Sequence, residues 1–437
     1  MQHRRSSKLL VLPVIAAMAL AACGSDSKDT ASTSTAAPAA TEAPAGTEAP
    51  AETEAPAGTE APADTEAPAG TEAPAGSEAP AETTAAGEGG SLAGICPETV
   101  TIQLDWMPEA EHGFVYQMVG EGYEVDTEKA AVVGPLIDAA GDDTGVKIRI
   151  QSGGGAQNFQ SVTSLLYQDD NILLGYVYTD EAIQNSDTFP TVAIESGFEK
   201  NPQMIMWDPE TYPDVTGIAD LGTAGVPVLY FGGAAYMDYF TSTGILSADQ
   251  VDGSYTGDPS LFVTAEGKTA QQGFGSAEPF LYESELPDWG KPVKYEYIND
   301  VGWNNYAESI ATKPENIEKY ADCFTKLVPI IQQASVDYVN DPARTNATIL
   351  AAVEGFGGDF GWSYTEGAAD FGVATMLRDG LIANGTDGVM GSFDMDRVAD
   401  LIEKATPVYT AQDSPPKEGL TPEDIVTNQF IDPSISL

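Results

Sequence analysis

Acidic and aromatic side chains follow several predicted strands, and together they could bind a nitrogen-containing solute. The acidic candidates are Asp105 and Glu278, and the aromatic candidates are Trp106, Tyr176, Tyr178, Tyr236 and Trp303. A flat heterocycle stacks on an aromatic ring while its amino groups donate to a carboxylate, and an organic cation is attracted by both groups. Binders of sulfonate, nitrate or phosphate usually place Arg or Lys at the anion, and these loops contain neither.

Glycine pairs mark the ends of two predicted strands. Gly154 lies in a run of three glycines after residues 146–150, and Gly232 and Gly233 follow residues 226–231. Glycine lets a backbone approach a ligand closely, and a helix start that follows it offers free N–H groups. Tight turns without a ligand explain the same glycines.

His112 fits a ligand contact and a structural hydrogen bond equally well, and every aromatic candidate has core packing as its alternative.

Alternating strands and helices are predicted to position these residues. Strands are expected at residues 100–104, 146–150, 172–178, 192–194, 226–231 and 293–298. Helices are expected near residues 113–121 and 159–166, from residue 234, and at 317–338, an apolar stripe that contains Pro329. This order predicts an α/β fold with mixed, mostly parallel sheets whose carboxyl ends face the ligand. Residues 124–143 have the pattern of a polar insert, and residues 271–279 that of a loop.

The first 90 residues predict export and tethering. Arg4, Arg5 and Lys8 precede an apolar stretch too short for a stable membrane anchor, and the segment ending at Cys23 resembles a bacterial lipoprotein signal. Residues 1–22 would be the signal peptide and Cys23 the lipidated residue. A plain signal peptide with an incidental Cys23 is the alternative. In residues 23–90 the unit Thr-Glu-Ala-Pro-Ala recurs from Thr41 onward, and no aromatic or branched aliphatic residue is available to bury, so we expect a disordered linker.

The remaining two cysteines predict a disulfide. Cys96 and Cys323 are the only thiols left once Cys23 carries lipid, and exported thiols tend to be oxidised. Two buried free thiols are the alternative.

The charge of the chain excludes several classes of partner. It has 19 basic and 67 acidic residues among 437, and its formal net charge is −48. Nucleic acid and anionic lipid surfaces are therefore not expected partners, which leaves the lipid on Cys23 as the membrane contact.

His3 would leave with the signal, and His112 alone cannot build a His-rich metal centre. We expect no catalytic residues, no metal and no cofactor, and hence no enzyme.

Two motifs carry a resemblance to a known family. Residues 104–112, Leu-Asp-Trp-Met-Pro-Glu-Ala-Glu-His, resemble the opening of the solute-binding proteins of ABC importers for thiamine-pyrimidine precursors. Residues 273–281, Gly-Phe-Gly-Ser-Ala-Glu-Pro-Phe-Leu, resemble the loop of the second lobe in that group, although Ala277 replaces its Asn. The broader group contains nitrate, sulfonate and taurine binders. The resemblance covers residues 99–341 approximately.

The resemblance implies a two-lobed, periplasmic-binding-protein-like fold with the ligand between the lobes. Residues 97–200 and 299–437 would form lobe one, and residues 201–298 lobe two, within a solute-binding domain of residues 91–437. The expected role is a monomeric receptor, lipid-anchored at the outer face of the cell membrane, which delivers a small heteroaromatic compound such as a thiamine pyrimidine precursor to an ABC permease. Nitrate, sulfonate or taurine, riboflavin, an organic cation, and a surface lipoprotein without a transport role are the alternatives. The identity of the permease and the number of membranes in the envelope stay open.

Overall fold

The computed structural model describes residues 91–437 except residue 359. The predicted signal peptide of residues 1–22, the lipidated Cys23 and the linker that follows it lie outside the described residues.

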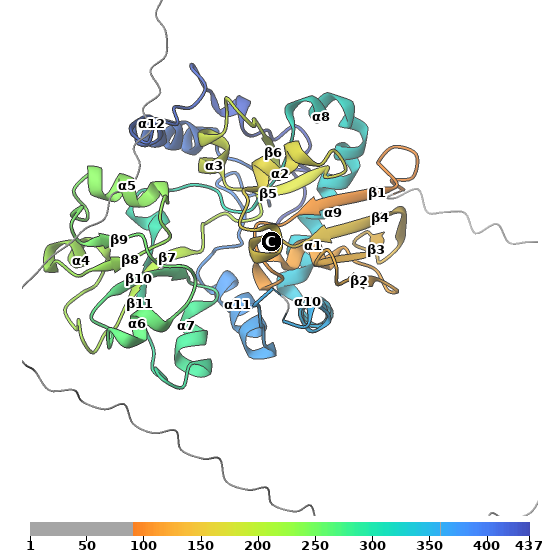
Figure 1. Cartoon of the computed structure of the whole chain (residues 1–437). Coiled ribbons are helices and arrows are strands. Elements are labelled where there is room, and N and C mark those ends of the chain that lie inside the picture. The colour runs from red at the N-terminus through yellow and green to blue at the C-terminus, as the bar shows by residue number, and fades with distance from the viewer. Residues whose placement is uncertain (1–90, 359) are drawn as a thin grey trace, which may run out of the picture. The chain divides into compact units, whose positions relative to one another are not determined.

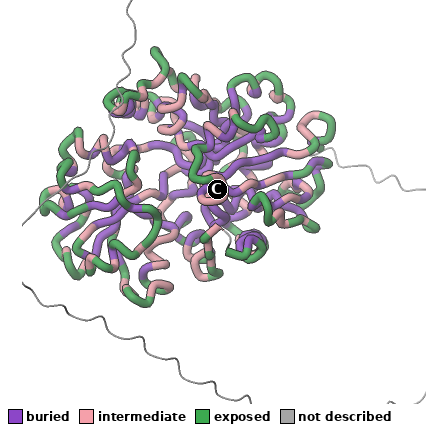
Figure 2. Tube along the Cα trace, viewed as in Figure 1, coloured by how far each residue is buried: buried purple, intermediate pink, exposed green. Residues whose placement is uncertain are grey.

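Seven strands form the first sheet, in the order β2-β3-β4-β1-β5-β12-β6 (Figure 1). Their bounds are β1 (Thr99–Gln103), β2 (Glu124–Asp126), β3 (Ala131–Ile137), β4 (Asp143–Gln151), β5 (Leu174–Val177), β6 (Val192–Glu195) and β12 (Ser309–Thr312). β1 pairs in parallel with β4 and β5, and the outer pairs are antiparallel. The central strands are buried, as the purple segments of Figure 2 show.

Five strands form the second sheet, in the order β11-β7-β10-β8-β9. Their bounds are β7 (Gln203–Trp207), β8 (Val228–Leu229), β9 (Val251–Asp252), β10 (Ala270–Phe274) and β11 (Lys294–Tyr297). β8 pairs in parallel with β9 and β10, whereas β7 is antiparallel to both of its neighbours. The two-lobed α/β fold with mixed sheets is confirmed. Antiparallel pairs are more numerous than the sequence pattern predicted.

Helices cover the sheets and connect their strands. The longer helices are α2 (Val162–Gln168), α4 (Ile218–Ala224), α5 (Ala235–Ser242), α9 (Ala321–Asn340), α10 (Ala343–Phe356), α11 (Glu366–Arg378) and α12 (Met395–Ala411). The shorter ones are η1 (Ala110–His112), α1 (Gly113–Gln117), η2 (Gly154–Gln157), α3 (Thr179–Gln184), α6 (Ser260–Thr264), α7 (Glu278–Phe280), η3 (Leu281–Glu285), η4 (Ile298–Val301), α8 (Pro314–Lys319) and η5 (Pro422–Asp424). No described helix combines the length and apolar composition needed to cross a bilayer.

Three local predictions need correction. The predicted polar insert contains the β2-β3 hairpin, which extends the first sheet. Burial alternates along β3, but Gly134 and Pro135 interrupt the apolar pattern in the sequence that would have predicted this strand. Residues 270–274 form the strand β10 and not a loop, because they pair with β7 and β8 and because the side chains of Gln271 and Gln272 each have a hydrogen-bond partner. The helix expected at residues 317–338 is two helices, α8 and α9, which are separated by Tyr320 at φ −115° and ψ 23°.

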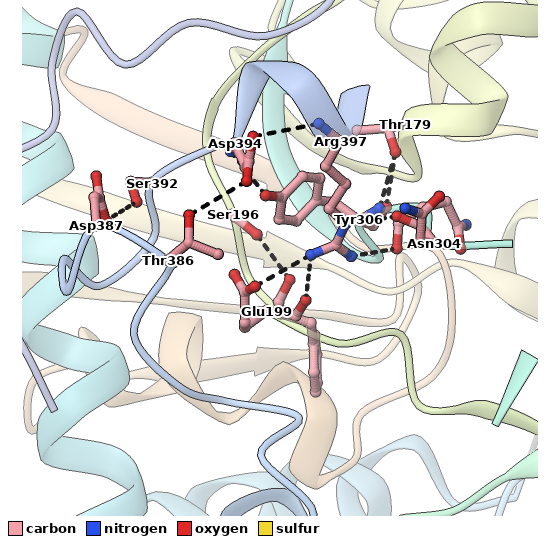
Figure 3. A network of polar contacts seen from close by, with 12 residues as sticks. Thr179, Ser196, Glu199, Asn304, Tyr306, Thr386, Asp387, Ser392, Asp394 and Arg397 are labelled. Carbon is pink, nitrogen blue, oxygen red and sulfur yellow. Dashed lines mark hydrogen bonds and ion pairs between the residues drawn. The ribbon is translucent and has the colours of Figure 1, made fainter. Parts of the chain in front are cut away.

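The chain crosses between the sheets twice, and Arg397 donates hydrogen bonds to both crossing segments. It enters the second sheet between β6 and β7 and returns between β11 and β12. The Arg397 guanidinium donates to the carbonyl oxygens of Glu199 at 2.7 Å and Asn304 at 2.6 Å, one on each crossing segment (Figure 3). Asn201 and Asn305 also join the two segments directly, side chain to side chain, at 2.7 Å.

The C-terminal helices contact elements of both lobes. α12 packs against α3, which follows a strand of the first sheet, and against α5, which follows a strand of the second. α11 packs against η1, and its Val373 and Met376 share a buried cluster with Met204 and Met206 of β7. The sequence-based proposal placed residues 299–437 in lobe one, whereas these helices bridge the two lobes.

The disulfide prediction is confirmed. Cys96, before β1, is bonded to Cys323 on α9, and their Cα atoms lie 4.9 Å apart. The bond closes a loop of 227 residues and fastens the start of the described chain to the longest helix.

Candidate functional site

A cavity of about 320 Å³ lies between the two lobes. From the side of the first sheet it is lined by Asp105, Trp106, Glu109, Glu111, Phe159, Tyr178, Glu308 and Trp362. From the side of the second sheet it is lined by Phe231, Tyr255, Gly257, Gln272, Gly273, Phe274, Ala277 and Glu278. The lining is therefore aromatic and acidic, and none of these residues is basic.

Trp106 forms one wall of the cavity, and the glycine run after β4 positions it. The Gly153 N–H donates to the Trp106 carbonyl at 2.8 Å, and the Gly154 N–H donates to the Asp105 carbonyl at 2.9 Å. Gly154 has φ +53°, and a Cβ there would lie 2.9 Å from the Trp106 ring. The position requires glycine for both reasons. The indole can therefore lie directly against the backbone.

Two further aromatic rings surround Trp106. Trp362 meets it edge-on, with ring centroids 6.2 Å apart, and the Trp362 indole N–H donates to the Pro108 carbonyl at 3.0 Å. Phe159 lies 5.7 Å from Trp106 and is 66 % exposed. An exposed phenylalanine at the rim of a cavity is available to cover a bound solute, because its apolar ring gains from contact with one.

Hydrogen bonds fix the polar groups on the second-sheet side. Gln272 of β10 accepts from the Tyr236 hydroxyl at 2.6 Å and from the Phe231 N–H at 3.1 Å. Glu278, the first residue of α7, accepts from the Phe274 N–H at 2.6 Å. A Cβ at Gly273 would lie 3.0 Å from the Glu278 carboxyl carbon, so a side chain there would displace the carboxylate.

Five carboxylates face the cavity, and most are buried. Glu109, Glu111 and Glu308 are 8 %, 4 % and 1 % exposed. The Ser276 hydroxyl of the second lobe donates to Glu111 of the first, which makes a polar contact across the cavity. Asp105 and Glu278 complete the set. A cationic or donor-rich solute would relieve the mutual repulsion of these groups.

The pKa values of four of these carboxylates are raised. Burial raises the pKa of Glu111 to about 8, against the opposing hydrogen bond from Ser276, and raises the pKa of Glu278 to about 7. The pKa of Glu109 lies well above its usual range because of burial and then repulsion by Glu111. The pKa of Glu308 is raised by burial and then by the charge of Asp105. Burial and mutual repulsion therefore favour the uncharged form of these carboxyl groups, and a bound cation would favour the charged form.

His112 lies behind the cavity wall. Its ring is fully buried, its Nε2 lies 3.2 Å from Asp105 Oδ1, and its ring centroid is 5.3 Å from that of Tyr176. Glu308 immediately precedes β12 and has φ +48°, a left-handed conformation that costs a residue with a side chain on the order of 1 kcal/mol. The fold thus holds the Glu308 carboxylate in place against a local preference.

The structure places the predicted site residues in three groups. Asp105, Trp106, Tyr178 and Glu278 line the cavity. Gly154, His112 and Tyr236 lie directly behind lining residues and hold them in place.

The other four predicted residues do not line the cavity. Tyr176 is fully buried within β5, where its ring stacks on that of Phe114 with centroids 5.4 Å apart, whereas Tyr178, which lines the cavity, follows the end of that strand. Trp303 is fully buried, and its indole N–H donates to Asp180 at 3.0 Å. Gly232 packs against Gly253, and Gly233 forms a turn at φ +91°. Core packing and tight turns, the alternatives stated above, account for all four.

Several lining residues escaped sequence reasoning. Glu109 and Glu111 lie in the quoted motif of residues 104–112, and this pair of glutamates two residues apart, soon after the strand, was an available signal. Glu308, Phe159, Tyr255 and Trp362 come from distant segments, and no local pattern marks them as neighbours.

The known proteins to which this chain is similar are solved structures and not sequence matches. No protein-family model matches the chain, and no curated protein matches it. A ligand-binding component of an ABC-type import system from Staphylococcus aureus, solved with zinc bound, is 13 % identical, with 78 % of this chain and 100 % of that chain covered and a TM-score of 0.47.

Two further solved structures are similar in fold. The periplasmic aliphatic sulphonate binding protein SsuA from Escherichia coli is 14 % identical, with 78 % and 94 % of the two chains covered and a TM-score of 0.47. The periplasmic nitrate-binding protein NrtA from Synechocystis PCC 6803 is 11 % identical, with 75 % and 92 % covered and a TM-score of 0.39. Likeness at these identities concerns the fold alone.

Proposed function

We propose that this chain is an extracytoplasmic solute-binding protein of an ABC importer, and that it captures a small, amino-bearing nitrogen heterocycle or organic cation between its lobes. The observation that carries the proposal is the cavity of about 320 Å³ with five carboxylates, an aromatic wall and no basic lining residue. Binding without catalysis is sufficient to explain this arrangement. The preferred ligand is a thiamine pyrimidine precursor, whose ring would stack on Trp106.

The polar groups of the cavity suit a ligand that donates hydrogen bonds. Glu278 and Glu111 already accept hydrogen bonds from protein groups, but each carboxylate has further lone pairs. Ring amino groups would reach them while the aromatic wall contacts the ring faces. A positive charge on the ring would add attraction to both the carboxylates and the indole.

An anionic ligand fits this cavity poorly. A nitrate or sulfonate would meet five acidic side chains without a Lys or Arg to compensate them. Riboflavin also lacks a positive charge that would use the carboxylates. A surface lipoprotein without transport would have no need for a lined cavity between lobes.

The proposed cellular arrangement follows from the N-terminal sequence. Lipid on Cys23 would anchor the protein outside the cell membrane, and the linker would let a monomeric receptor reach its permease. Closure of the lobes around the solute would form the surface that the permease recognises.

Calorimetry with a solute panel tests the proposal. The panel contains an aminopyrimidine, thiamine, riboflavin, a polyamine, taurine and nitrate, each titrated into the purified full-length protein with EDTA present. Binding of the aminopyrimidine should weaken about ten- to hundredfold in Trp106→Ala, because one stacking face is lost. Glu278→Gln should weaken it at least as much, and the exposed neighbour variant Glu283→Gln should not. Micromolar binding of taurine or nitrate, with every nitrogen heterocycle and cation inert, would overturn the proposal.

A further inference from the structure

Three potential metal ligands from separate segments converge at the base of the cavity. Asp105 follows β1, His112 ends η1, and Glu308 precedes β12. His112 Nε2 lies 3.2 Å from Asp105 Oδ1 and 4.0 Å from Glu308 Oε2. The three ligand atoms all lie within 4.8 Å of one another. Atoms bound at about 2.0–2.2 Å to one tetrahedral Zn²⁺ lie roughly 3.4 Å apart, so small side-chain movements would bring all three into coordination.

A buried atom without a partner points into this cluster. Glu308 Oε2 has no hydrogen-bond partner among the described residues, although the Glu308 side chain is 1 % exposed. This oxygen lies 4.0 Å from Nε2 of His112, whose side chain is fully buried. Leaving a carboxylate oxygen buried and unpaired is unfavourable, and a cation between Glu308, His112 and Asp105 would satisfy it.

We propose that Asp105, His112 and Glu308 form a site for a divalent transition-metal ion, with Zn²⁺ as the best-fitting ion. One imidazole and two carboxylates supply the N and O donors that Zn²⁺ accepts, and three protein ligands leave a fourth position open. That position faces the cavity, because Asp105 and Glu308 line it. A water molecule or a nitrogen atom of a solute would occupy it. The shortage of histidines excludes a His-rich centre, but it does not exclude this mixed set.

The electrostatics of the cavity agree with a cation at this position. Glu109 and Glu111 lie beside the three ligands, so further carboxyl groups adjoin this position and no residue that lines the cavity is basic. Ca²⁺ is a poorer fit, because it takes six to eight oxygen ligands and this cluster offers an imidazole nitrogen. The proposal does not depend on the organic solute proposed above, since the ion would bind the protein alone.

Metal titration of the full-length protein tests the site. Chelator-treated protein is titrated with Zn²⁺ by calorimetry, and with Co²⁺ while its visible absorption is recorded. We expect one ion per chain and a tetrahedral Co²⁺ spectrum. Loss of an outer partner of a metal ligand typically weakens binding 10–100-fold, so loss of a ligand in His112→Gln or Glu308→Gln should weaken it at least about 100-fold. Glu195→Gln, which changes a buried carboxylate that does not line the cavity, is the matched control and should bind like the wild type.

The outcomes separate this site from solute binding. Absence of stoichiometric Zn²⁺ binding by the wild type, or equal affinity in wild type and His112→Gln, overturns the metal site. If a variant loses its fold by circular dichroism, the Co²⁺ spectrum of the wild type decides, since the weak absorption of octahedral Co²⁺ also overturns the site. Solute binding measured with EDTA present is unaffected by either result.

Discussion

The guanidinium of Arg397 lies 3.7 Å from the ring centroid of Tyr306. The same guanidinium donates to backbone carbonyls on both segments that cross between the lobes. The Tyr306 hydroxyl in turn accepts from the N–H of Asp394, the residue that caps α12. One cation thus joins the start of α12 to both segments that cross between the lobes.

Arg397→Met should therefore destabilise the protein. The variant leaves three partly buried carbonyl oxygens without their donor, and we expect the free energy of unfolding to fall by about 3 kcal/mol. Arg378→Met is the control, because Arg378 is 54 % exposed and should contribute less than about 1 kcal/mol. Urea unfolding of both variants measures the difference. Equal losses in the two would contradict the role assigned to Arg397.

Glu195 should make stability fall as pH rises. Burial raises the pKa of this carboxyl to about 8, from an ordinary value near 4.5 in the unfolded chain, and neither oxygen has a partner among the described residues. The folded state therefore holds a proton that the unfolded state releases between these values. Glu195→Gln should stabilise the protein by up to about 5 kcal/mol at pH 8 and change little at pH 4.

Unfolding curves across this pH range test Glu195. The exposed Glu283→Gln serves as the control, and it should leave the shape of the pH profile unchanged. A Glu195→Gln variant that runs parallel to the wild type from pH 4 to pH 8 would show that the carboxyl titrates normally.

Removing the disulfide should cost substantial stability. Cys96 and Cys323 close a loop of 227 residues, and the chain-entropy account assigns such a loop about 5 kcal/mol. Cys96→Ser and Cys323→Ser should each lower the free energy of unfolding by this amount, and adding reductant should affect only the wild type. A reductant effect that persists in either variant would require another disulfide.

Gly154→Ala should weaken solute binding beyond its effect on stability. The new Cβ would contact the Trp106 ring, and φ +53° disfavours alanine by about 1 kcal/mol. Gly380→Ala imposes the same backbone cost at φ +64° but meets nothing within 4 Å. Both variants should unfold more easily, and only Gly154→Ala should lose affinity for the aminopyrimidine. Equal affinities would show that Trp106 does not contact the solute.

Cys23→Ser tests the predicted lipid anchor. The variant should appear outside the membrane fraction or remain as an uncleaved precursor, because serine cannot form the thioether. Fractionation followed by mass measurement of the intact chain distinguishes these results. Ser25→Ala, two residues away, should remain anchored, and a processed Cys23→Ser protein that stays on the membrane would exclude lipidation at this residue.

The sequence by itself determined the class of fold and the chemistry of the site. Strand and helix periodicity is a local property, so the α/β order was readable, and once Cys23 is assigned to the predicted lipid anchor only Cys96 and Cys323 are left to pair. The absence of Lys and Arg from the loops around Trp106 and Glu278 was also visible, and it agrees with the acidic lining of the cavity.

Only the tertiary structure decided which side chains share the site. Glu308 and Trp362 reach Trp106 across more than 200 residues, and their meeting depends on sheet order and on the packing of the C-terminal helices, which no local pattern encodes. Tyr176 likewise packs on Phe114 in the core while Tyr178 lines the cavity, and the sequence marked both tyrosines alike. Burial of Glu109, Glu111 and Glu308 together arises from this long-range convergence, and the raised pKa values arise from that burial.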